Sequence, residues 1–547
     1  MNQFIHFLFF SFGLAFLLFA AASASALSPN SQTLNQEFEN FLSQYVADEH
    51  TGNHQLAVLQ QFYAARNYQP AWINSTSQSS RIEAILSFIA SAENEGLDSH
   101  DYRLKQLLQL STEHSPLSRY ELEFRATLAL LQYAHDLYRG RFIASEIDPD
   151  WHIPQPDFDA VSFLLKTAES KNLLQSLESL APNIPSYQLL KTALAKYREL
   201  AARQVSWQQI PNVPVLRPGD SHPVIPFVRT RITQAYETHG KIEYLLVASE
   251  ESENSNLYDI NLAHAIKAFQ LQHGLNADGI IGQNTLNALN KTPLEKIQQL
   301  RINMERLRWL PRDLEDRYLI VNIPGFQLTA VENDQYILEM RIIVGRNYRS
   351  TPSFHSRITH MIVNPFWNIP ASIARKDLLP KQQKDPDYFN SQNIKVYPDY
   401  SYSSAPIDPD TIDWQGIRSG FPYALRQDPG MQNALGSIKF MLPNRFSIYL
   451  HDTPSKALFN REIRTFSSGC IRLEKPLLLA EFALHEQTSA ERINEQISTG
   501  RTIQINLPEP LPTYIVYLTV WVDNQNTIHY SPDTYGRDQR ALKFAHW

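Results

Sequence analysis

The sequence predicts an α+β chain of several domains, helical in its N-terminal half and mainly β in its C-terminal half. At 547 residues the chain is longer than a single hydrophobic core usually fills. Between residues 27 and 205, apolar side chains recur every three or four positions, which is the period of a helix. From about Tyr318 the period changes to two, which is the period of a strand.

Residues 1–26 are typical of an export signal. The run from Phe7 to Ala22 is almost continuously apolar, and Ala24-Ser25-Ala26 follows as a small-residue cleavage pattern. Because residues 1–6 contain no Lys or Arg, an uncleaved anchor is the alternative. No later segment is apolar over the roughly 20 residues that a membrane helix needs. We therefore expect an exported protein with no stable membrane span once the signal is cleaved.

Residues 27–205 predict a helical domain that precedes the rest of the protein. Clusters of Pro, Asn and Ser separate its amphipathic segments, which include Leu34–Val46, Arg81–Glu93, Tyr120–Leu137 and Leu189–Ala202. The stretch Gln204–Val224 is rich in proline and is expected to connect this domain to the next one.

Residues 206–292 are expected to hold this linker and a compact helical module. One helix face carries Tyr258, Leu262, Ile266 and Phe269. The segment His273-Gly274-Leu275 closes this helix, Asp278-Gly279 and Gly282 turn the chain, and Thr285 opens the next helix. The pattern resembles the small three-helix peptidoglycan-binding domain found in many cell-wall enzymes. A generic helix hairpin is the alternative.

Residues 310–510 predict a mainly β domain with one long insertion. Its β-rich runs are Tyr318–Ile323, Gln327–Val331, Tyr336–Val344, His360–Asn364, Ser437–Met441 and Ser447–Leu450. Between residues 375 and 436 the pattern breaks into a stretch rich in Pro and Tyr, which we interpret as an ordered lid. Residues 511–547 are expected to form a C-terminal extension with a hairpin from Tyr514–Val522 and Thr527–Tyr530.

The charge balance and the cysteine count limit the function. A formal net charge of −7 argues against nucleic acid as a partner. Cys470 is the only cysteine, so it cannot form an intramolecular disulfide, and a free thiol is a liability in an oxidising compartment. A chemical role is therefore favoured over a place in the core. We expect no cofactor and no metal, because His50 and His54 lie four residues apart, a spacing that is commonly chance.

A cysteine–histidine pair lies in the segment from Ile448 to Leu473. A β-rich run ends at His451, and further along the chain Gly469 allows the sharp bend that presents Cys470. The amides of Gly469 and Cys470 are expected to face a developing oxyanion. Because a cysteine has an ordinary pKa of about 8.5, we predict that His451 is the base that ionises it. Asp452 would orient the imidazole through its side chain or its backbone carbonyl.

These residues resemble the signature of the L,D-transpeptidase catalytic domain. The likeness is carried by Ser467-Ser468-Gly469-Cys470-Ile471-Arg472, Val363-Asn364-Pro365, Trp367-Asn368-Ile369-Pro370, Asn433-Ala434-Leu435-Gly436, Lys439-Phe440 and Tyr449-Leu450-His451-Asp452-Thr453-Pro454. Upstream, Tyr68-Gln69-Pro70-Ala71-Trp72, Gly140-Arg141 and Asp148-Pro149-Asp150-Trp151 are similar to the helical scaffold of the long Gram-negative periplasmic branch. Most of the family has His before Gly-Cys. Because Ser468 stands there in this chain, His451 is the one well-placed base.

The resemblance implies a periplasmic enzyme that acts on the stem peptides and glycan of peptidoglycan. Cys470 would attack the carbonyl of the third stem-peptide residue and release D-Ala, and an amine of a neighbouring stem would attack the thioester to give a 3→3 cross-link. Arg472 would hold a substrate carboxylate or carbonyl, with a structural salt bridge as the alternative. Further candidates for substrate binding are Tyr449, Ser467, Ser468, Trp367 and Asn433. Carbapenems are expected to acylate the cysteine, and cell-wall synthesis enzymes are candidate partners.

Other functions stay open at the level of sequence. If water replaced the acceptor amine, the same thioester would give L,D-carboxypeptidase or endopeptidase activity, and the difference depends on how well the lid excludes water. A non-catalytic cell-wall-binding protein would use residues 256–290 alone, but this leaves the cysteine–histidine pair without a role. A papain-like protease is disfavoured because its cysteine precedes its histidine in the chain.

Overall fold

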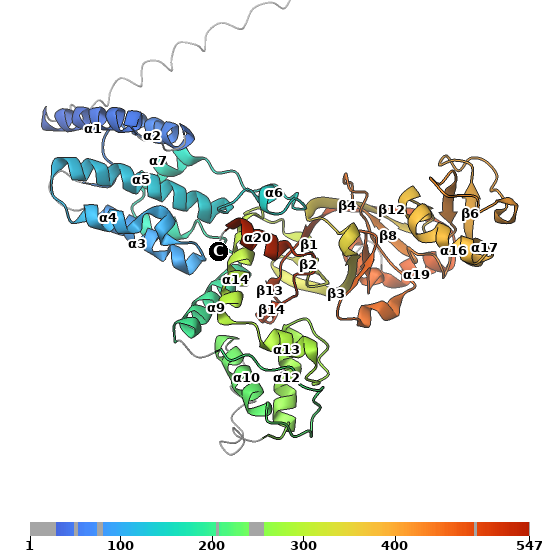
Figure 1. Cartoon of the computed structure of the whole chain (residues 1–547). Helices are drawn as coiled ribbons and strands as arrows, with labels where there is room; N and C mark the ends of the chain where they lie inside the picture. The colour runs from blue at the N-terminus through green and yellow to red at the C-terminus, as the bar shows by residue number, and fades with distance from the viewer. Residues whose placement is uncertain are drawn as a thin grey trace, which may run out of the picture. The chain divides into compact units, whose positions relative to one another are not determined.

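The computed structural model describes residues 29–48, 53–73, 80–203, 207–239, 256–485 and 489–545. The expected export signal lies outside these residues. The chain divides into two compact units. Figure 1 colours the chain by residue number, so that the segments of each unit can be found along it. Unit 1 comprises Met1–Glu93, Asp98–His135 and Phe158–Leu180, and unit 2 comprises Asn94–Leu97, Asp136–Asp157 and Ala181–Trp547.

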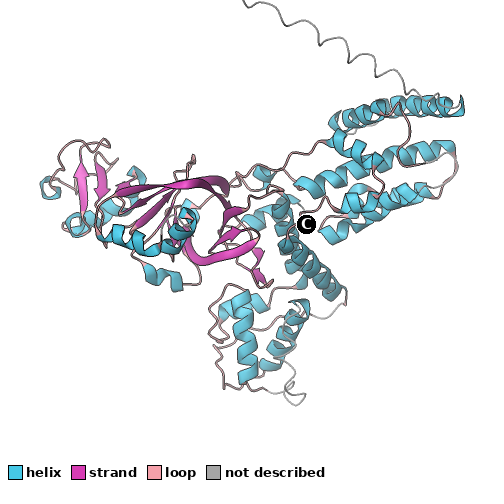
Figure 2. Cartoon of the chain, turned by 180° about the vertical axis from the view of Figure 1, so that it is seen from behind, coloured by secondary structure: helices cyan, strands magenta, loops and turns pink. Residues whose placement is uncertain are grey.

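Unit 1 is helical, as the sequence predicts, and Figure 2 shows its described part in cyan and loop colours alone. Its helices are α1 (Pro29–Asp48), α2 (Asn53–Ala65), α3 (Ser80–Ala90), α4 (Leu104–Ser111), the main part of α5 (Pro116–Arg139), α7 (Ala160–Glu169) and α8 (Leu173–Glu178). Inside it, the carboxylate of Glu123 on α5 accepts hydrogen bonds from the amides of Ala71, Trp72 and Ile73 at 2.6, 3.0 and 3.1 Å. These bonds satisfy the buried polar groups of a segment that is not helical.

The helical part of unit 2 includes a small module with its own core. The helices of this part are α6 (Ala144–Ile147), α9 (Pro185–Ala202), α10 (Ile225–His239), α12 (Ile260–Gln272), α13 (Gln283–Leu289) and α14 (Pro293–Arg308). Helices α10, α12 and α13 enclose a hydrophobic cluster that contains Tyr258, Leu262 and Phe269. The turn before α13 depends on Gly279, which has φ +72° and whose carbonyl accepts from the Tyr258 hydroxyl at 2.6 Å. The predicted three-helix module is confirmed.

The β part of unit 2 is a nine-stranded sheet in the order β10-β3-β11-β9-β8-β4-β12-β1-β2, and β2 also pairs with β3, so that the sheet closes on itself. The strands are β1 (Arg317–Asn322), β2 (Gln327–Glu332), β3 (Gln335–Gly345), β4 (Phe354–Val363), β8 (Ile438–Met441), β9 (Leu450–His451), β10 (Thr465–Ser467), β11 (Ile471–Leu473) and β12 (Ile503–Val516). Alternate residues of these strands point inward and form the core together with α18 (Pro476–Leu484) and α19 (Ala490–Ser498).

The C-terminal residues differ from the expectation at one point. Tyr514 to Val516 do not belong to a terminal hairpin, because they continue β12 and pair in parallel with β1 inside the closed sheet. The hairpin consists of β13 (Val520–Val522) and β14 (Ile528–Tyr530), and α20 (Arg537–Ala545) follows it. The sequence is nearly all apolar from residue 514 to residue 522, so it gave no sign that the strand is interrupted at residues 517–519.

The insertion at residues 375–436 is a folded subdomain. A three-stranded sheet in the order β5-β7-β6 combines β5 (Trp367–Ile369), β7 (Ala424–Gln427) and β6 (Ile394–Tyr397). A helical stretch leads into the insertion through α15 (Ala371–Ile373), a π-helical turn (Ala374–Leu378), α16 (Leu379–Lys384) and α17 (Tyr388–Ser391). Phe389, Val396 and Trp414 belong to a separate hydrophobic core there.

Within the described ranges of the whole chain, no helix has both the length and the apolar composition that a bilayer crossing requires.

Candidate active site

One face of the closed sheet collects the residues that the sequence singles out. In the parallel pair β9–β11, His451 lies opposite Arg472, and in the antiparallel pair β8–β9 it lies opposite Lys439. Side chains at paired positions project to the same face of a sheet, so these three share one face. The neighbouring residues Leu450 and Ile471 are fully buried in the core on the other face.

Cys470 lies on this face beside Tyr449. Its Sγ is 3.9 Å from the Ser447 carbonyl oxygen, and the backbone and the side chain of Tyr449 both lower the pKa of the thiol. The side chain is half-buried, and burial raises the pKa of the Cys470 thiol, although Tyr449 and Lys439 act in the opposite direction. At neutral pH the side chain is therefore a protonated thiol.

His451 is buried and its ring orientation is fixed by a backbone group. Its Nδ1 lies 2.5 Å from the Asp452 carbonyl oxygen, which can only accept a hydrogen bond, so Nδ1 carries the proton. Burial, and then the charge of Arg472, lower the pKa of His451 to about 3. The ring is therefore neutral, and its lone pair is on Nε2.

The Asp452 carboxylate holds a loop and does not contact the imidazole. One of its oxygens accepts from the amide and the hydroxyl of Ser437 at 2.9 and 2.8 Å, and the other accepts from Lys456 at 2.6 Å. Burial raises the pKa of Asp452, but Lys456 and the Ser437 amide lower it to a value below the usual one. A Cβ at Gly436, which has φ +61°, would lie 2.3 Å from this carboxylate, so the approach requires glycine. Of the two orienting groups left open by the sequence, the structure shows the backbone carbonyl.

The turn before the nucleophile differs from the expectation in one detail. Gly469 has φ +117°, which favours glycine. Its N–H donates to the Ser467 hydroxyl at 3.1 Å, and this hydroxyl donates to the Cys470 carbonyl at 2.5 Å. The Gly469 amide is therefore occupied by the turn itself, and the Cys470 N–H is the amide that remains for an oxyanion.

Ser468 lies directly before Gly469, at the position where the resemblance led us to expect histidine. It is exposed, and its hydroxyl accepts from Arg349 at 2.8 Å. Arg349 also forms an ion pair with Asp377 in the π-helical turn of the insertion. Ser468 thus connects the Cys470 turn to the base of the insertion and supplies no base of its own.

Two further candidates line the same face of the sheet. The Arg472 guanidinium is half-buried, its Nε has no hydrogen-bond partner, and the charged groups that act on it are Arg346 and Cys470. Among the described residues it has no carboxylate partner, so the structural salt bridge is not formed. Trp367 on β5, just before the insertion, lowers the pKa of Tyr449, which burial raises.

Asn433 is not placed to bind substrate. It is 1% exposed, its amide group donates to the carbonyls of Pro365 and Asp428 at 3.0 and 2.9 Å, and its oxygen accepts from the Leu435 amide at 2.8 Å. These bonds use the side chain to hold the loop between β7 and β8. A motif position carries no mark that separates such a structural asparagine from one that faces a ligand.

Sequence reasoning did not assign a role to Lys439. Its Nζ lies 3.9 Å from the centre of the Tyr449 ring, and burial lowers its pKa while Cys470 raises it. The signal was the register of β8 against β9, which places Lys439 opposite His451 and which cannot be derived from either segment alone.

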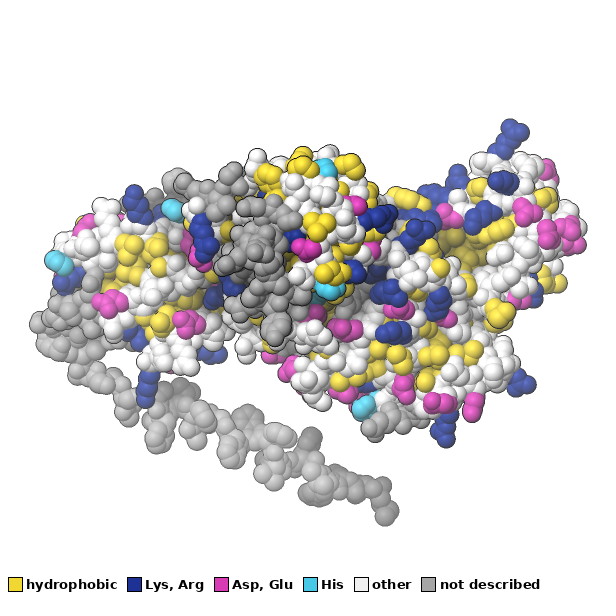
Figure 3. All heavy atoms as spheres, turned by 90° about the horizontal axis from the view of Figure 1, so that it is seen from below, with side chains coloured by type: hydrophobic (Ala, Val, Ile, Leu, Met, Phe, Trp, Pro, Cys, Tyr) yellow, Lys and Arg dark blue, Asp and Glu magenta, His cyan; other side chains and the backbone are white. Residues whose placement is uncertain are grey.

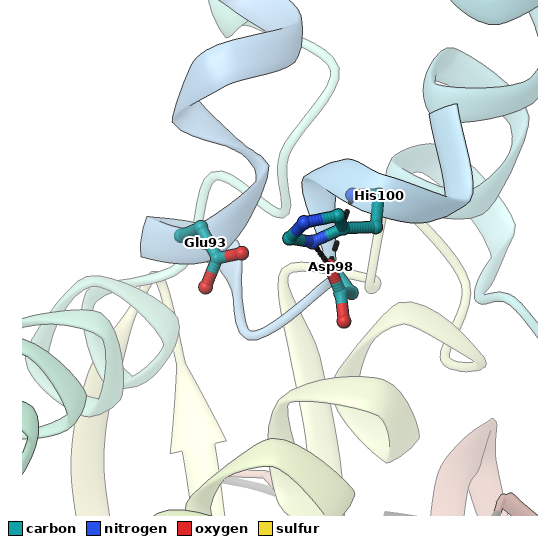
Figure 4. A group of neighbouring side chains, drawn as sticks. All are labelled: Glu93, Asp98 and His100. Carbon is teal, nitrogen blue, oxygen red and sulfur yellow. Dashed lines mark hydrogen bonds and ion pairs between the residues drawn. The ribbon is translucent and has the colours of Figure 1, made fainter. Parts of the chain in front are cut away.

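Outside this face, one group of side chains in the described part has a metal-like composition. Glu93, Asp98 and His100 of unit 1 point toward one another in Figure 4, within 4.8 Å. Asp98 accepts from the backbone and the ring of His100 at 2.9 Å and thereby caps the short helix Ser99–Tyr102. Local capping accounts for the group.

On the face drawn in Figure 3, hydrophobic side chains reach the surface between charged ones of both signs.

Comparisons with known proteins agree with this organisation. A scaffold domain model matches residues 57–194, a peptidoglycan-binding domain model matches residues 243–289, and an L,D-transpeptidase catalytic domain model matches residues 316–505. A Haemophilus influenzae protein named "Putative L,D-transpeptidase" is 39% identical over 244 residues, which are 44% of this chain and 48% of that protein. The match thus spans about half the length of this relative.

A solved structure is also similar in part. The crystal structure of an L,D-transpeptidase from Xylanimonas cellulosilytica matches with 12% identity over 56% of this chain and 99% of that chain. Its TM-score of 0.17 is too low to support a shared fold.

Proposed function

We propose that this protein forms 3→3 cross-links between the stem peptides of peptidoglycan. The chain carries a scaffold domain, a peptidoglycan-binding domain and an L,D-transpeptidase catalytic domain in this order. The observation that supports this most is the pairing of a half-buried thiol with a neutral, backbone-oriented imidazole. Cys470 directly precedes β11, whose Arg472 lies opposite His451 on β9, and Nδ1 of His451 carries its proton, so that the lone pair on Nε2 can accept one. This is the arrangement that nucleophilic acyl transfer needs.

The first half of the reaction forms a thioester. The Cys470 sulfur attacks the carbonyl of the third stem-peptide residue while its proton passes to Nε2 of His451. The negative charge that develops on the carbonyl oxygen faces the Cys470 N–H. When the intermediate collapses, the bond to D-Ala breaks, and its nitrogen takes the proton from His451.

The second half reverses these steps with a new amine. The side-chain amine of a diamino acid on a neighbouring stem attacks the thioester, and His451 accepts its proton. The carbon–sulfur bond breaks and the thiol regains the proton. The product is an amide between two stems, and no proton or electron is left over.

The half-buried side chain of Arg472, close to the nucleophile, is the group that would bind the substrate. Arg472 lacks a carboxylate partner among the described residues, and a buried charge is stabilised when a ligand supplies one. A carboxylate of the stem peptide has the charge and the planar shape for this role.

The test is incubation of the purified protein with disaccharide-tetrapeptide, with the products resolved by mass spectrometry. We expect release of D-Ala and a cross-linked dimer, and we expect Cys470→Ala to abolish both. Ser498→Ala, an equally small change at the exposed end of α19, is the matched control and should retain both products. Release of D-Ala by Cys470→Ala would rule out the proposed nucleophile. Tripeptide without dimer in the wild-type protein would show the hydrolytic reaction instead.

A further inference from the structure

The carbonyl of Gly469 is held by a residue of the strand-to-strand connection that follows β3. Thr351 is fully buried, and its hydroxyl donates to the Gly469 carbonyl oxygen at 2.8 Å. The same hydroxyl accepts from the Gly345 amide at 2.9 Å. A Cβ at Gly345 would lie 2.1 Å from the Arg349 carbonyl oxygen and 3.1 Å from Cα of Gly469, so the two segments approach as closely as backbone allows.

Thr351 is held in turn by residues near the C-terminus. The Tyr535 hydroxyl donates to the Gly345 carbonyl at 2.5 Å and accepts from the Thr351 amide at 3.4 Å. Arg537, which is fully buried, donates to the Thr351 carbonyl at 2.9 Å. It also contacts Asp148 and Asp150 at 3.3 Å each, so its position is fixed from a third segment of unit 2.

The location of these residues is informative. Tyr535 and Arg537 lie beyond residue 505, where the match to the catalytic domain model ends. Their hydrogen bonds hold the backbone of Thr351 and Gly345, and the Thr351 hydroxyl in turn bonds the turn that presents the nucleophile.

We propose that Thr351, supported by Tyr535 and Arg537, is a positioning residue that aims the Cys470 N–H at the oxyanion. A peptide unit is planar and trans, so its carbonyl and its N–H point in opposite directions. The hydroxyl that fixes the Gly469 carbonyl therefore also fixes the direction of the Cys470 N–H. This N–H is the amide of the turn that is not used by Ser467.

The inference rests on the proposed acyl transfer, but its test does not depend on peptidoglycan. The probe 4-nitrophenyl acetate acetylates a cysteine through a tetrahedral oxyanion: the sulfur–carbon bond forms, and 4-nitrophenolate leaves. Iodoacetamide alkylates the same sulfur by displacement of iodide, without an oxyanion. The ratio of the two rate constants for Cys470 thus reports oxyanion stabilisation separately from the reactivity of the thiol.

The variant is Thr351→Val, which keeps the shape of the side chain and removes the hydroxyl. Because loss of one oxyanion donor lowers such rates about 100-fold or more, we expect misdirection of the donor to lower acetylation at least about 10-fold. Alkylation should stay within about 2-fold at each pH tested, because the thiol and its ionisation are unchanged. Thr351→Ser should restore acetylation, and Tyr535→Phe should lower it in the same direction.

Thr513→Val is the matched control, because Thr513 is also fully buried, lies on β12 and bonds the Leu511 carbonyl, away from the turn. It should leave both rate constants as in the wild type. The proposal is overturned if Thr351→Val acetylates at the wild-type rate. It is equally overturned if acetylation and alkylation fall by the same factor, because the hydroxyl would then only support the fold.

Discussion

At the scale of residues, Cys470 and His451 are both neutral at rest because both are withdrawn from water. Burial raises the pKa of the thiol and lowers the pKa of the imidazole to about 3. The sequence suggested that the imidazole ionises the thiol before substrate arrives. The structure instead favours proton transfer during the attack, because a charged pair would carry the cost of burial in both partners.

This protonation state predicts an unusual acid limb in the pH profile. His451 accepts a proton only while its ring is neutral, and with a pKa of about 3 it remains neutral well below the ordinary histidine range. We expect kcat/KM for disaccharide-tetrapeptide to lack a protonation step between pH 7 and pH 5, and to be lost as pH falls through about 3. Rates measured from pH 3 to pH 8 would check this.

Stability must be followed in the same experiment. A histidine whose folded pKa lies below its unfolded value binds fewer protons in the folded state, so it lowers the free energy of unfolding as pH falls from about 6.5 toward about 3. Circular dichroism at each pH separates this loss from titration of the base. An acid limb centred near pH 6.5 with the fold intact would contradict a buried neutral His451.

The sequence predicted the chemical partners but not their hydrogen bonds. Motif order and the single cysteine were enough to choose Cys470 and His451. They did not show that the Asp452 carbonyl orients the ring, that Ser467 occupies the Gly469 amide, or that Asn433 is locked into a loop. Each of these depends on which polar atoms meet across segments that are distant in sequence.

At the scale of elements, the sequence predicted that the insertion is ordered but did not predict its strands. Residues 375–436 were expected to be ordered because of their aromatic content, yet the period of the strands was not visible. Strands β6 and β7 have four residues each, which is too short for an alternation to stand out among prolines. The small core around Trp414 is what makes the insertion an independent element.

We propose that this subdomain acts as a lid that shelters the thioester from water. The centre of the Trp414 ring lies 5.1 Å from the centre of the Phe389 ring, and the indole N–H donates to the Pro409 carbonyl at 2.9 Å. Loss of a buried aromatic ring costs about 3–5 kcal/mol, which a core of this size cannot absorb. We expect Trp414→Ala to lower dimer formation far more than thioester formation, with hydrolysed tripeptide as the excess product measured by mass spectrometry.

Trp414→Phe provides the comparison, since it keeps most of the ring volume and loses one hydrogen bond. It should stay closer to the wild-type ratio of dimer to tripeptide. Equal losses of thioester and dimer in Trp414→Ala, with an unchanged product ratio, would mean that the subdomain supports the sheet and does not control access of water.

At the scale of the whole molecule, unit 2 contains several separate hydrophobic cores within one compact body. The closed sheet, the insertion and the three-helix module each bury their own cluster. The order of these parts was predictable, because each has a distinct periodicity or turn pattern. Their mutual contacts were not, since they depend on single polar residues such as Glu462, which accepts from the Asn276 amide at 3.1 Å and from Asn284 at 2.9 Å.

Separate cores predict that attachment to the cell wall and chemistry can be uncoupled. Tyr258 is fully buried in the module, and its hydroxyl closes the turn at Gly279. Because Tyr258→Ala opens this core and no other, we expect the module to lose its fold, at a cost of about 3–5 kcal/mol, while the closed sheet keeps its own.

Co-sedimentation with insoluble peptidoglycan should weaken at least about 10-fold, because the module is the proposed wall-binding part. Turnover of soluble disaccharide-tetrapeptide should stay within about 3-fold of the wild type, because Cys470 and His451 belong to the sheet. Tyr258→Phe retains the ring and should bind nearly as well as the wild type. If soluble turnover instead falls together with sedimentation in Tyr258→Ala, the module is a working part of the catalytic body and the two functions are not separable.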